Sequence, residues 1–222
     1  FDNGKTESFG TDESWLMGDG KILFSEIYDG EVYDAGKEIS NLTPVTVYPD
    51  ESKDEIIEQE GEIVREMERF SPKKIIKTPK GETIIDFGQN LVGYPVFSVN
   101  AKAGEKISLS FGEVLDKDGN FYTGNYRSAK CQYRYTCRDG KQTYKPKLTF
   151  WGFRYVRVNA FPGGLDKTDP TAFTAVALYS EMKRTGHLSC SSPKLNQLFS
   201  NILWGQRCNF LDVPTDCPQR DE

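Results

Sequence analysis

The residues best suited to chemistry lie at the end of the sequence. Three carboxyl side chains, Asp216, Asp221 and Glu222, fall within seven residues, and Arg220 lies between them. Repulsion between clustered carboxylates raises the pKa of one of them, which can then donate a proton near neutral pH. Because the guanidinium of Arg220 favours ionised neighbours, we expect one protonated and two ionised carboxyl groups. Such a set can protonate a departing oxygen while the ionised members accept hydrogen bonds from hydroxyl groups.

Two prolines, Pro214 and Pro218, flank Asp216. Proline lacks a backbone donor and restricts φ, so this stretch is not predicted to continue a helix. We expect Asp216 to lie in an irregular, rigid loop, and rigidity suits a site because a small displacement of a catalytic group slows a reaction severely. Composition alone favours a plainer interpretation, in which the stretch is a solvated connector.

An amphipathic helix is predicted directly before this loop. Ser192 followed by Pro193 is typical of a helix start, with a capping serine and a proline in the first turn. Apolar residues then recur three and four apart, at Leu195, Leu198, Phe199, Ile202 and Leu203. A single amphipathic helix cannot bury such a stripe by itself. We therefore expect residues 182–222 to begin a domain whose further chain covers this stripe, with His187 in a surface strand that enters it.

Residues 71–181 carry the clearest strand pattern. Ile107, Leu109 and Phe111 share one face of a half-buried strand. Further strands are predicted at 83–87, 94–99, 132–136, 155–158 and 173–178, and a turn at 117–120. Short strands separated by Gly and Asp turns predict a mainly β fold, an antiparallel sandwich whose core the 14 Phe, 11 Tyr and 3 Trp residues of the chain can fill.

Residues 1–70 are predicted to hold the last strands of another sandwich and a charged linker. The stretch 22–33 is apolar and aromatic, whereas 50–69 is dense in charge with few apolar residues at helical spacing. An extended linker with a short strand at 63–67 is favoured over a helix, and Ser71-Pro72 marks a boundary. The chain starts without Met or a signal peptide and stops inside a polar motif, so we expect it to be cut from a longer protein.

Composition excludes several classes of protein. A net charge of −5, with both signs interspersed, argues against binding to nucleic acid. No run of 18 apolar residues predicts a membrane-spanning helix. Cys131 and Cys137 lie roughly 20 Å apart in one predicted strand, too far for a disulfide. Cysteines that form no disulfide favour a cytoplasmic location. The sequence does not determine the oligomeric state.

Other candidate sites have plainer alternatives. Trp151, with its aromatic neighbours Phe150 and Phe153, suits either sugar stacking or a core, and the core is favoured. Asp86 and Asn90 around Gly88 suit a sugar or ion site, but an Asx turn is favoured. Calcium at the acidic residues Asp29, Glu31 and Asp34 is disfavoured because strand alternation points Glu31 away from Asp34. A single His and no clustered ligands argue against zinc, and no metal or organic cofactor is predicted.

Four segments of the sequence resemble the bacterial α-L-rhamnosidases of glycoside hydrolase family 78. The first is 28–35, the second is 86–93, the third runs from 111–115 to 150–156, and the fourth is 204–222. The first has Gly36 where the family has Arg. The last, Trp204 to Glu222, is similar to the family's active-site segment almost residue for residue. The resemblance implies the end of an N-terminal sandwich, a concanavalin-like (jelly-roll) sandwich and the first helix of an (α/α)6 barrel, with divisions at 1–70, 71–181 and 182–222.

The resemblance also implies an activity, the hydrolysis of terminal α-L-rhamnosides with inversion. By position, Glu222 matches the general acid and Asp216 a carboxylate that binds sugar hydroxyls, while Arg220 and Asp221 lie beside them in the pocket. The family's general base is a later Glu that these 222 residues lack, so the chain alone is expected to be inactive. Two alternatives stay open: a non-catalytic carbohydrate-binding sandwich, and an (α/α)6 glycosidase for another sugar.

Overall fold

The structure is a computed structural model that describes residues 2–48 and 57–219, which are mostly strands with one α-helix. The strands are β1 (Leu16–Asp19), β2 (Ile22–Glu26), β3 (Gly30–Asp34), β4 (Ser40–Pro44), β5 (Val64–Phe70), β6 (Lys74–Lys77), β7 (Thr83–Ala101), β8 (Lys106–Gly112), β9 (Gln132–Thr136), β10 (Gly140–Tyr144), β11 (Trp151–Ala160), β12 (Phe173–Ser180), β13 (Phe210–Leu211) and β14 (Val213–Pro214). The helix is α1 (Pro193–Cys208), and two short 3-10 helices are η1 (Leu165–Lys167) and η2 (Pro170–Ala172).

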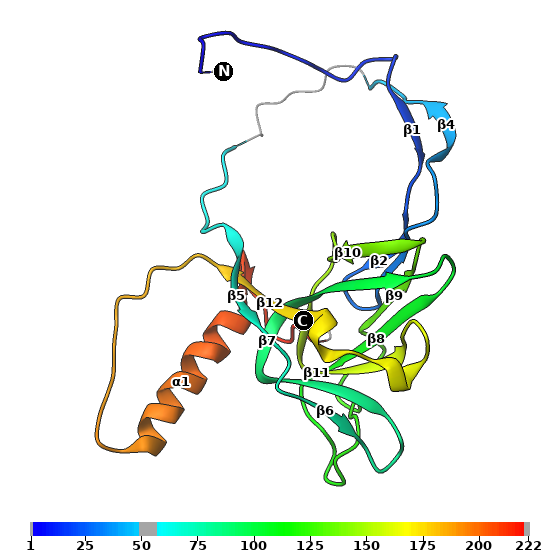
Figure 1. Cartoon of the computed structure of the whole chain (residues 1–222). Helices are drawn as coiled ribbons and strands as arrows, with labels where there is room; N and C mark the ends of the chain where they lie inside the picture. The colour runs from blue at the N-terminus through cyan, green and yellow to red at the C-terminus, as the bar shows by residue number, and fades with distance from the viewer. Residues whose placement is uncertain (1, 49–56, 220–222) are drawn as a thin grey trace.

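Among the described residues, ten strands form one curled sheet, in the order β2-β3-β9-β8-β11-β7-β12-β5, with β10 and β6 also paired to β7. The sheet curls into two layers because β7, which has 19 residues, is long enough to belong to both. Its first half pairs with β6 and β11, and its second half with β12 and β10. Figure 1 shows the resulting sandwich, with α1 beside β5, β7 and β12. The predicted mainly β sandwich is confirmed, and the pairings are antiparallel except that β3 and β9 run parallel.

Two glycines between the halves of β7 allow it to bend. Gly88 has φ 79° and Gly93 has φ 153°, which L side chains rarely adopt. A Cβ at Gly93 would also lie only 1.9 Å from the carbonyl oxygen of Val176 on β12. The strand can therefore pass from one layer to the other only with glycine at this point.

Aromatic rings fill the space between the layers. Trp151 is 1% exposed and stacks on Phe111 with ring centroids 4.1 Å apart. Phe153 is fully buried and packs edge-on against Phe87. Phe150 is partly buried and lies against a smaller cluster on the outer face. The core interpretation of Trp151 and Phe153 is therefore confirmed, and neither ring is available to stack on a sugar.

The strands of residues 1–70 are divided between two sheets. A two-stranded arm, β1 with β4, stands apart, but β2, β3 and β5 are hydrogen-bonded into the ten-stranded sheet. The strand expected at 63–67 overlaps β5, which begins one residue later and continues to Phe70. Strands from both sides of residue 70 thus belong to the same sheet. The division of the chain into three parts stays a prediction.

The carboxylates at which calcium was considered and disfavoured have protein partners. Glu31 is 1% exposed and accepts hydrogen bonds from the hydroxyl of Tyr144 and the backbone N–H of Lys147. Asp29 pairs with Lys130, and Asp34 accepts from a nearby backbone N–H. No group of three or more potential metal ligands occurs among residues 2–48 and 57–219.

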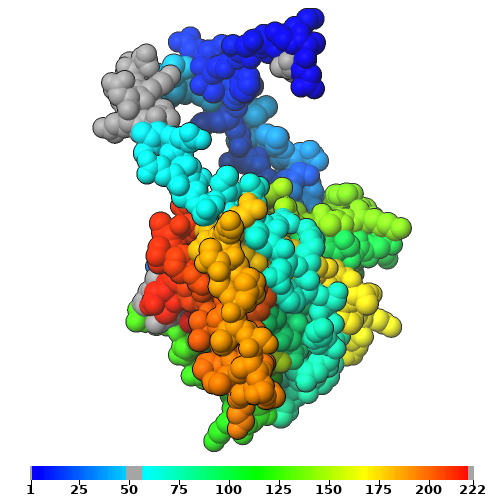
Figure 2. Space-filling view, turned by 90° about the vertical axis from the view of Figure 1, so that its left-hand side faces the viewer, coloured from blue at the N-terminus to red at the C-terminus, as the bar shows by residue number. Residues whose placement is uncertain are grey.

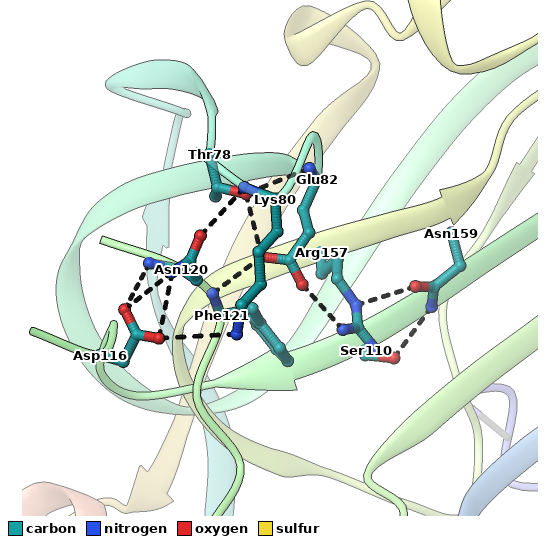
Figure 3. Close-up of polar contacts among 9 residues, drawn as sticks. All are labelled: Thr78, Lys80, Glu82, Ser110, Asp116, Asn120, Phe121, Arg157 and Asn159. Carbon is teal, nitrogen blue, oxygen red and sulfur yellow. Dashed lines mark hydrogen bonds and ion pairs between the residues drawn. The ribbon is translucent and has the colours of Figure 1, made fainter. Parts of the chain in front are cut away.

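A network of polar contacts stabilises the sandwich around Glu82, Asp116 and Arg157 (Figure 3). The turn predicted at 117–120 is confirmed, and Asp116 accepts the backbone N–H of Asn120 at 2.7 Å. Glu82 binds the guanidinium of Arg157 through one oxygen, at 3.0 Å, and the backbone N–H of Phe121 through the other, also at 3.0 Å. This network joins the turn to the β6–β7 hairpin and to β11, and β7 also carries Gln89 and Asn90 of the candidate site.

The helix α1 begins as predicted, with Ser192 at the N-cap and Pro193 in the first turn, but the capping contact differs. The Ser192 side chain makes no capping hydrogen bond. Asn196 closes this end instead, because its side chain accepts from the N–H and donates to the carbonyl of Cys190. The strand expected around His187 was wrong: His187 lies in exposed, irregular chain. Within the described residues, no helix is long and apolar enough to cross a bilayer.

The sugar or ion site considered at Asp86 is an Asx turn. Asp86 is 2% exposed, accepts from the backbone N–H of Gly88 at 2.7 Å, and receives two hydrogen bonds from Arg154, at 2.9 and 3.1 Å. Burial alone would raise the pKa of Asp86, but the hydrogen bonds from Arg154 and Gly88 hold this pKa below its ordinary value. The ionised carboxylate therefore stabilises the bulge where β7 turns.

Replacing Asp86 with asparagine is expected to lower the free energy of unfolding by about 1–3 kcal/mol at neutral pH. A lowered folded pKa gives stability that is present above the unfolded pKa of about 3.9 and is lost as pH falls through the folded value. The difference between wild type and variant should therefore shrink below about pH 4, measured by urea unfolding at several pH values. Asp166→Asn is the control, because that side chain is 96% exposed. A difference that does not change with pH would contradict this role.

Candidate active site

The segment after α1 makes a tight reversal before it reaches Asp216. β13 and β14 pair as a short hairpin around Asp212, whose φ is 70°. The backbone N–H of Thr215 then donates to the carbonyl of Asn209 at 2.9 Å. Asp216 follows in exposed, irregular chain, as the prolines predicted, and one of its oxygens accepts from the Cys217 thiol. The reversal turns the chain back towards the sandwich.

The C-terminal turn of α1 is held on the outer face of the sandwich. Arg207 binds Glu68 at 3.0 Å, and its guanidinium lies over the rings of Trp204 and Tyr179, 4.8 and 5.2 Å from their centroids. The hydroxyl of Tyr179 donates to the same Glu68 oxygen at 2.9 Å. Figure 2 shows this orange-to-red part of the chain lying directly against the cyan-to-green strands. The helix therefore has a defined position on β5 and β12.

Three of the five residues in the predicted apolar stripe stay largely exposed. Leu195, Leu198 and Ile202 are 53%, 53% and 57% exposed. Contact comes from the helix end and the hairpin, where buried Cys208 and Leu211 pack with Val92 of β7. These two residues lie outside the predicted stripe. The C-terminal part of α1 reaches the sandwich, where the ring of Trp204 also packs edge-on against Phe70 of β5.

A hollow of about 420 Å³ lies between the sandwich, α1 and the loop of Asp216. Its lining is mostly amide and carboxyl side chains, and includes Gln89, Asn90, Glu113, Asn201, Trp204, Asn209, Asp216 and Gln219. Within it, the amide of Asn90 donates to Glu113 at 3.0 Å. Amides and carboxylates around one aromatic ring suit a ligand rich in hydroxyl groups.

The structure places one of the four predicted site residues. Asp216 lines this hollow, while Arg220, Asp221 and Glu222 lie outside the described residues, so the polarised carboxyl set stays a prediction. Sequence reasoning missed Glu113 and Asn209 as lining residues. Glu113 does lie in one of the segments that resemble the rhamnosidases, but sequence spacing gives no sign that it approaches Asp216.

The loop carrying Asp216 is fixed to the sandwich at Gln219. The carbonyl of Gln219 accepts a hydrogen bond from the Cys131 thiol at 2.7 Å. None of the five cysteines, all of which the structure describes, forms a disulfide. Burial raises the pKa of the Cys131 thiol to about 12, so this group is protonated at neutral pH and can donate.

Comparison with known proteins gives one family over almost all of the chain. The family model for the α-L-rhamnosidase N-terminal domain matches residues 1–69, and that for the bacterial α-L-rhamnosidase concanavalin-like domain matches 76–179. The model for the bacterial α-L-rhamnosidase 6 hairpin glycosidase domain matches 183–222. The last match includes α1 and the whole candidate site segment.

Individual relatives agree with the family models. Curated α-L-rhamnosidases of Streptomyces avermitilis and Formosa agariphila are 36% and 39% identical to the chain, each over 99% of it. The crystal structure of the S. avermitilis enzyme complexed with L-rhamnose superimposes with a TM-score of 0.89 over the full chain. The native enzyme from Aspergillus terreus gives 0.86 at 35% identity over 99% of the chain.

The chain spans only 22–26% of the length of these relatives. Within that span the agreement is continuous: the sandwich, the helix that follows it and the segment of Asp216 all match in sequence, and the described part matches in structure. The chain therefore belongs to the bacterial α-L-rhamnosidase family.

Proposed function

We propose that this chain is part of an α-L-rhamnosidase that removes terminal L-rhamnose from glycosides with inversion of configuration. One observation carries the proposal: the identity to curated α-L-rhamnosidases extends over 99% of the chain, through the segment that resembles the family's active site. Because the chain spans about a quarter of those relatives, the activity belongs to the whole protein.

The proposed chemistry needs two carboxyl groups. In an inverting glycosidase one protonated carboxyl protonates the departing oxygen, while a carboxylate roughly 6.5–9.5 Å away activates water on the opposite face of the sugar. We assign the first role to Glu222. The second belongs to a glutamate outside these 222 residues, so the chain alone is inactive.

Asp216 is proposed to bind the sugar. Its carboxylate lies at a hollow lined by amide and carboxyl groups, which are the partners that sugar hydroxyls need. Arg220 and Asp221 are proposed to complete the pocket beside Glu222. No organic cofactor takes part in this mechanism.

Hydrolysis of an aryl α-L-rhamnoside by the whole protein tests the proposal. Inversion predicts that β-L-rhamnose appears first, which proton NMR can detect before the anomers equilibrate. Release of the α anomer first would contradict inversion. Binding of rhamnosides without hydrolysis would favour a carbohydrate-binding module, and hydrolysis of a different glycoside would replace the substrate class.

A further inference from the structure

The backbone of Gln219 lies directly against the start of β11. A Cβ at Gly152 would be 3.1 Å from the nitrogen and 3.4 Å from the Cα of Gln219. It would also lie 3.2 Å from a carboxylate oxygen of Glu113, but that flexible side-chain end can move. The φ of Gly152 is one that other residues adopt, so space rather than backbone conformation requires glycine here. The contact is backbone against backbone.

A second contact fixes the same residue from another side. The Cys131 thiol donates to the Gln219 carbonyl at 2.7 Å. Cys131 itself is held firmly, since its N–H donates to the carbonyl of Tyr28 and its carbonyl accepts from the N–H of Phe111. Gln219 is therefore held at two points of the sandwich, by Gly152 of β11 and by Cys131, the residue directly before β9.

This contact is close in the sequence to the proposed acid. Gln219 is three residues before Glu222, and three residues span at most roughly 10 Å of extended chain. A shift of the Gln219 backbone therefore displaces the segment that carries the acid. Displacements of about 1 Å can slow an enzymatic reaction roughly 100-fold.

We propose that Gly152 and Cys131 are positioning residues for catalysis, because they form a seat on the sandwich that sets the place of the segment ending at Glu222. The inference rests on the proposed function and adds to it. It gives Gly152 and Cys131 a part in the proton-transfer step through Gln219, without any contact of their own with the substrate.

The test uses the whole protein and a series of α-L-rhamnosides whose aglycones differ in leaving-group pKa. In Gly152→Ala we expect kcat to fall roughly 10- to 100-fold for a methyl aglycone. For a dinitrophenyl aglycone, which leaves without protonation, we expect only a few-fold loss. The plot of log kcat against leaving-group pKa should therefore become steeper, which a general loss of folded protein does not cause.

Val158→Ala is the matched control. Val158 lies on the same strand, is 2% exposed, and pairs with Leu109 and Thr83, at the end of β11 away from Gly152. This substitution also destabilises the sandwich, but it is expected to leave the slope of the plot as in the wild type. A change of slope in Val158→Ala equal to that in Gly152→Ala would overturn the positioning role.

Cys131 provides an independent pair of variants if Gly152→Ala folds poorly. Cys131→Ala removes the donor to Gln219 and should steepen the plot, whereas Cys131→Ser keeps a donor and should restore most of the wild-type slope. Equal slopes in wild type, Gly152→Ala and Cys131→Ala, in a protein that hydrolyses α-L-rhamnosides, would overturn the positioning role of these two residues but not the proposed function. A wild-type protein that hydrolyses none would overturn the proposed function instead.

Discussion

Replacing Glu222 with glutamine in the whole protein is expected to lower kcat for an alkyl α-L-rhamnoside by about 10²- to 10⁴-fold. The amide has nearly the same shape as the carboxyl but has no acidic proton to give to the departing oxygen. With a dinitrophenyl aglycone, whose phenolate leaves without protonation, most of the lost rate should return. Steady-state kinetics with both substrates measure the two effects.

Asp216→Asn is the comparison for that experiment. Its proposed role is to accept hydrogen bonds from the sugar, so the variant should lose kcat/KM by a similar factor for both aglycones. Near-normal turnover of the alkyl substrate by Glu222→Gln would remove Glu222 from the role of acid. In that case Asp216 and Asp221 become the candidates, and the same pair of aglycones would identify which of them donates the proton.

Replacing Trp151 with alanine is expected to lower the free energy of unfolding by about 3–5 kcal/mol. The ring is 1% exposed, stacks on Phe111 at 4.1 Å, and meets the ring of Tyr133 edge-on at 6.1 Å. Removing it leaves a cavity in a closely packed core, which neighbouring side chains can fill only in part. Urea unfolding of the 222-residue chain, followed by circular dichroism, measures the loss.

Trp15→Ala is the matched control, because Trp15 is 44% exposed. That variant should change the free energy of unfolding by no more than about 0.5 kcal/mol. Unchanged stability in Trp151→Ala, together with weaker binding of rhamnosides by the whole protein, would instead support sugar stacking by this ring. The buried position of Trp151 argues against that outcome.

Local patterns in the sequence determined the elements. Alternation placed the strands around Ile107 and Tyr133, the Asp-Gly-Asn sequence placed the turn at 117–120, and Ser192-Pro193 placed the start of α1. Each depends on residues close in the chain, whose backbone preferences act before any distant contact forms. The order of residues also determined the family, because the segment from 204 to 222 is continuous.

Only the tertiary structure decided how the candidate site is held. Cys131 and Gln219 are 88 positions apart, and their contact depends on how the sheet places β9 and β11 on either side of β8. The docking of α1 was likewise not predictable from its apolar stripe, because Trp204, Arg207 and Cys208 near the C-terminal end of the helix make the contacts with the sheet. Contacts of this kind depend on strand register and on the position of a helix relative to the sheet. Neither can be predicted from residues that are close in the sequence.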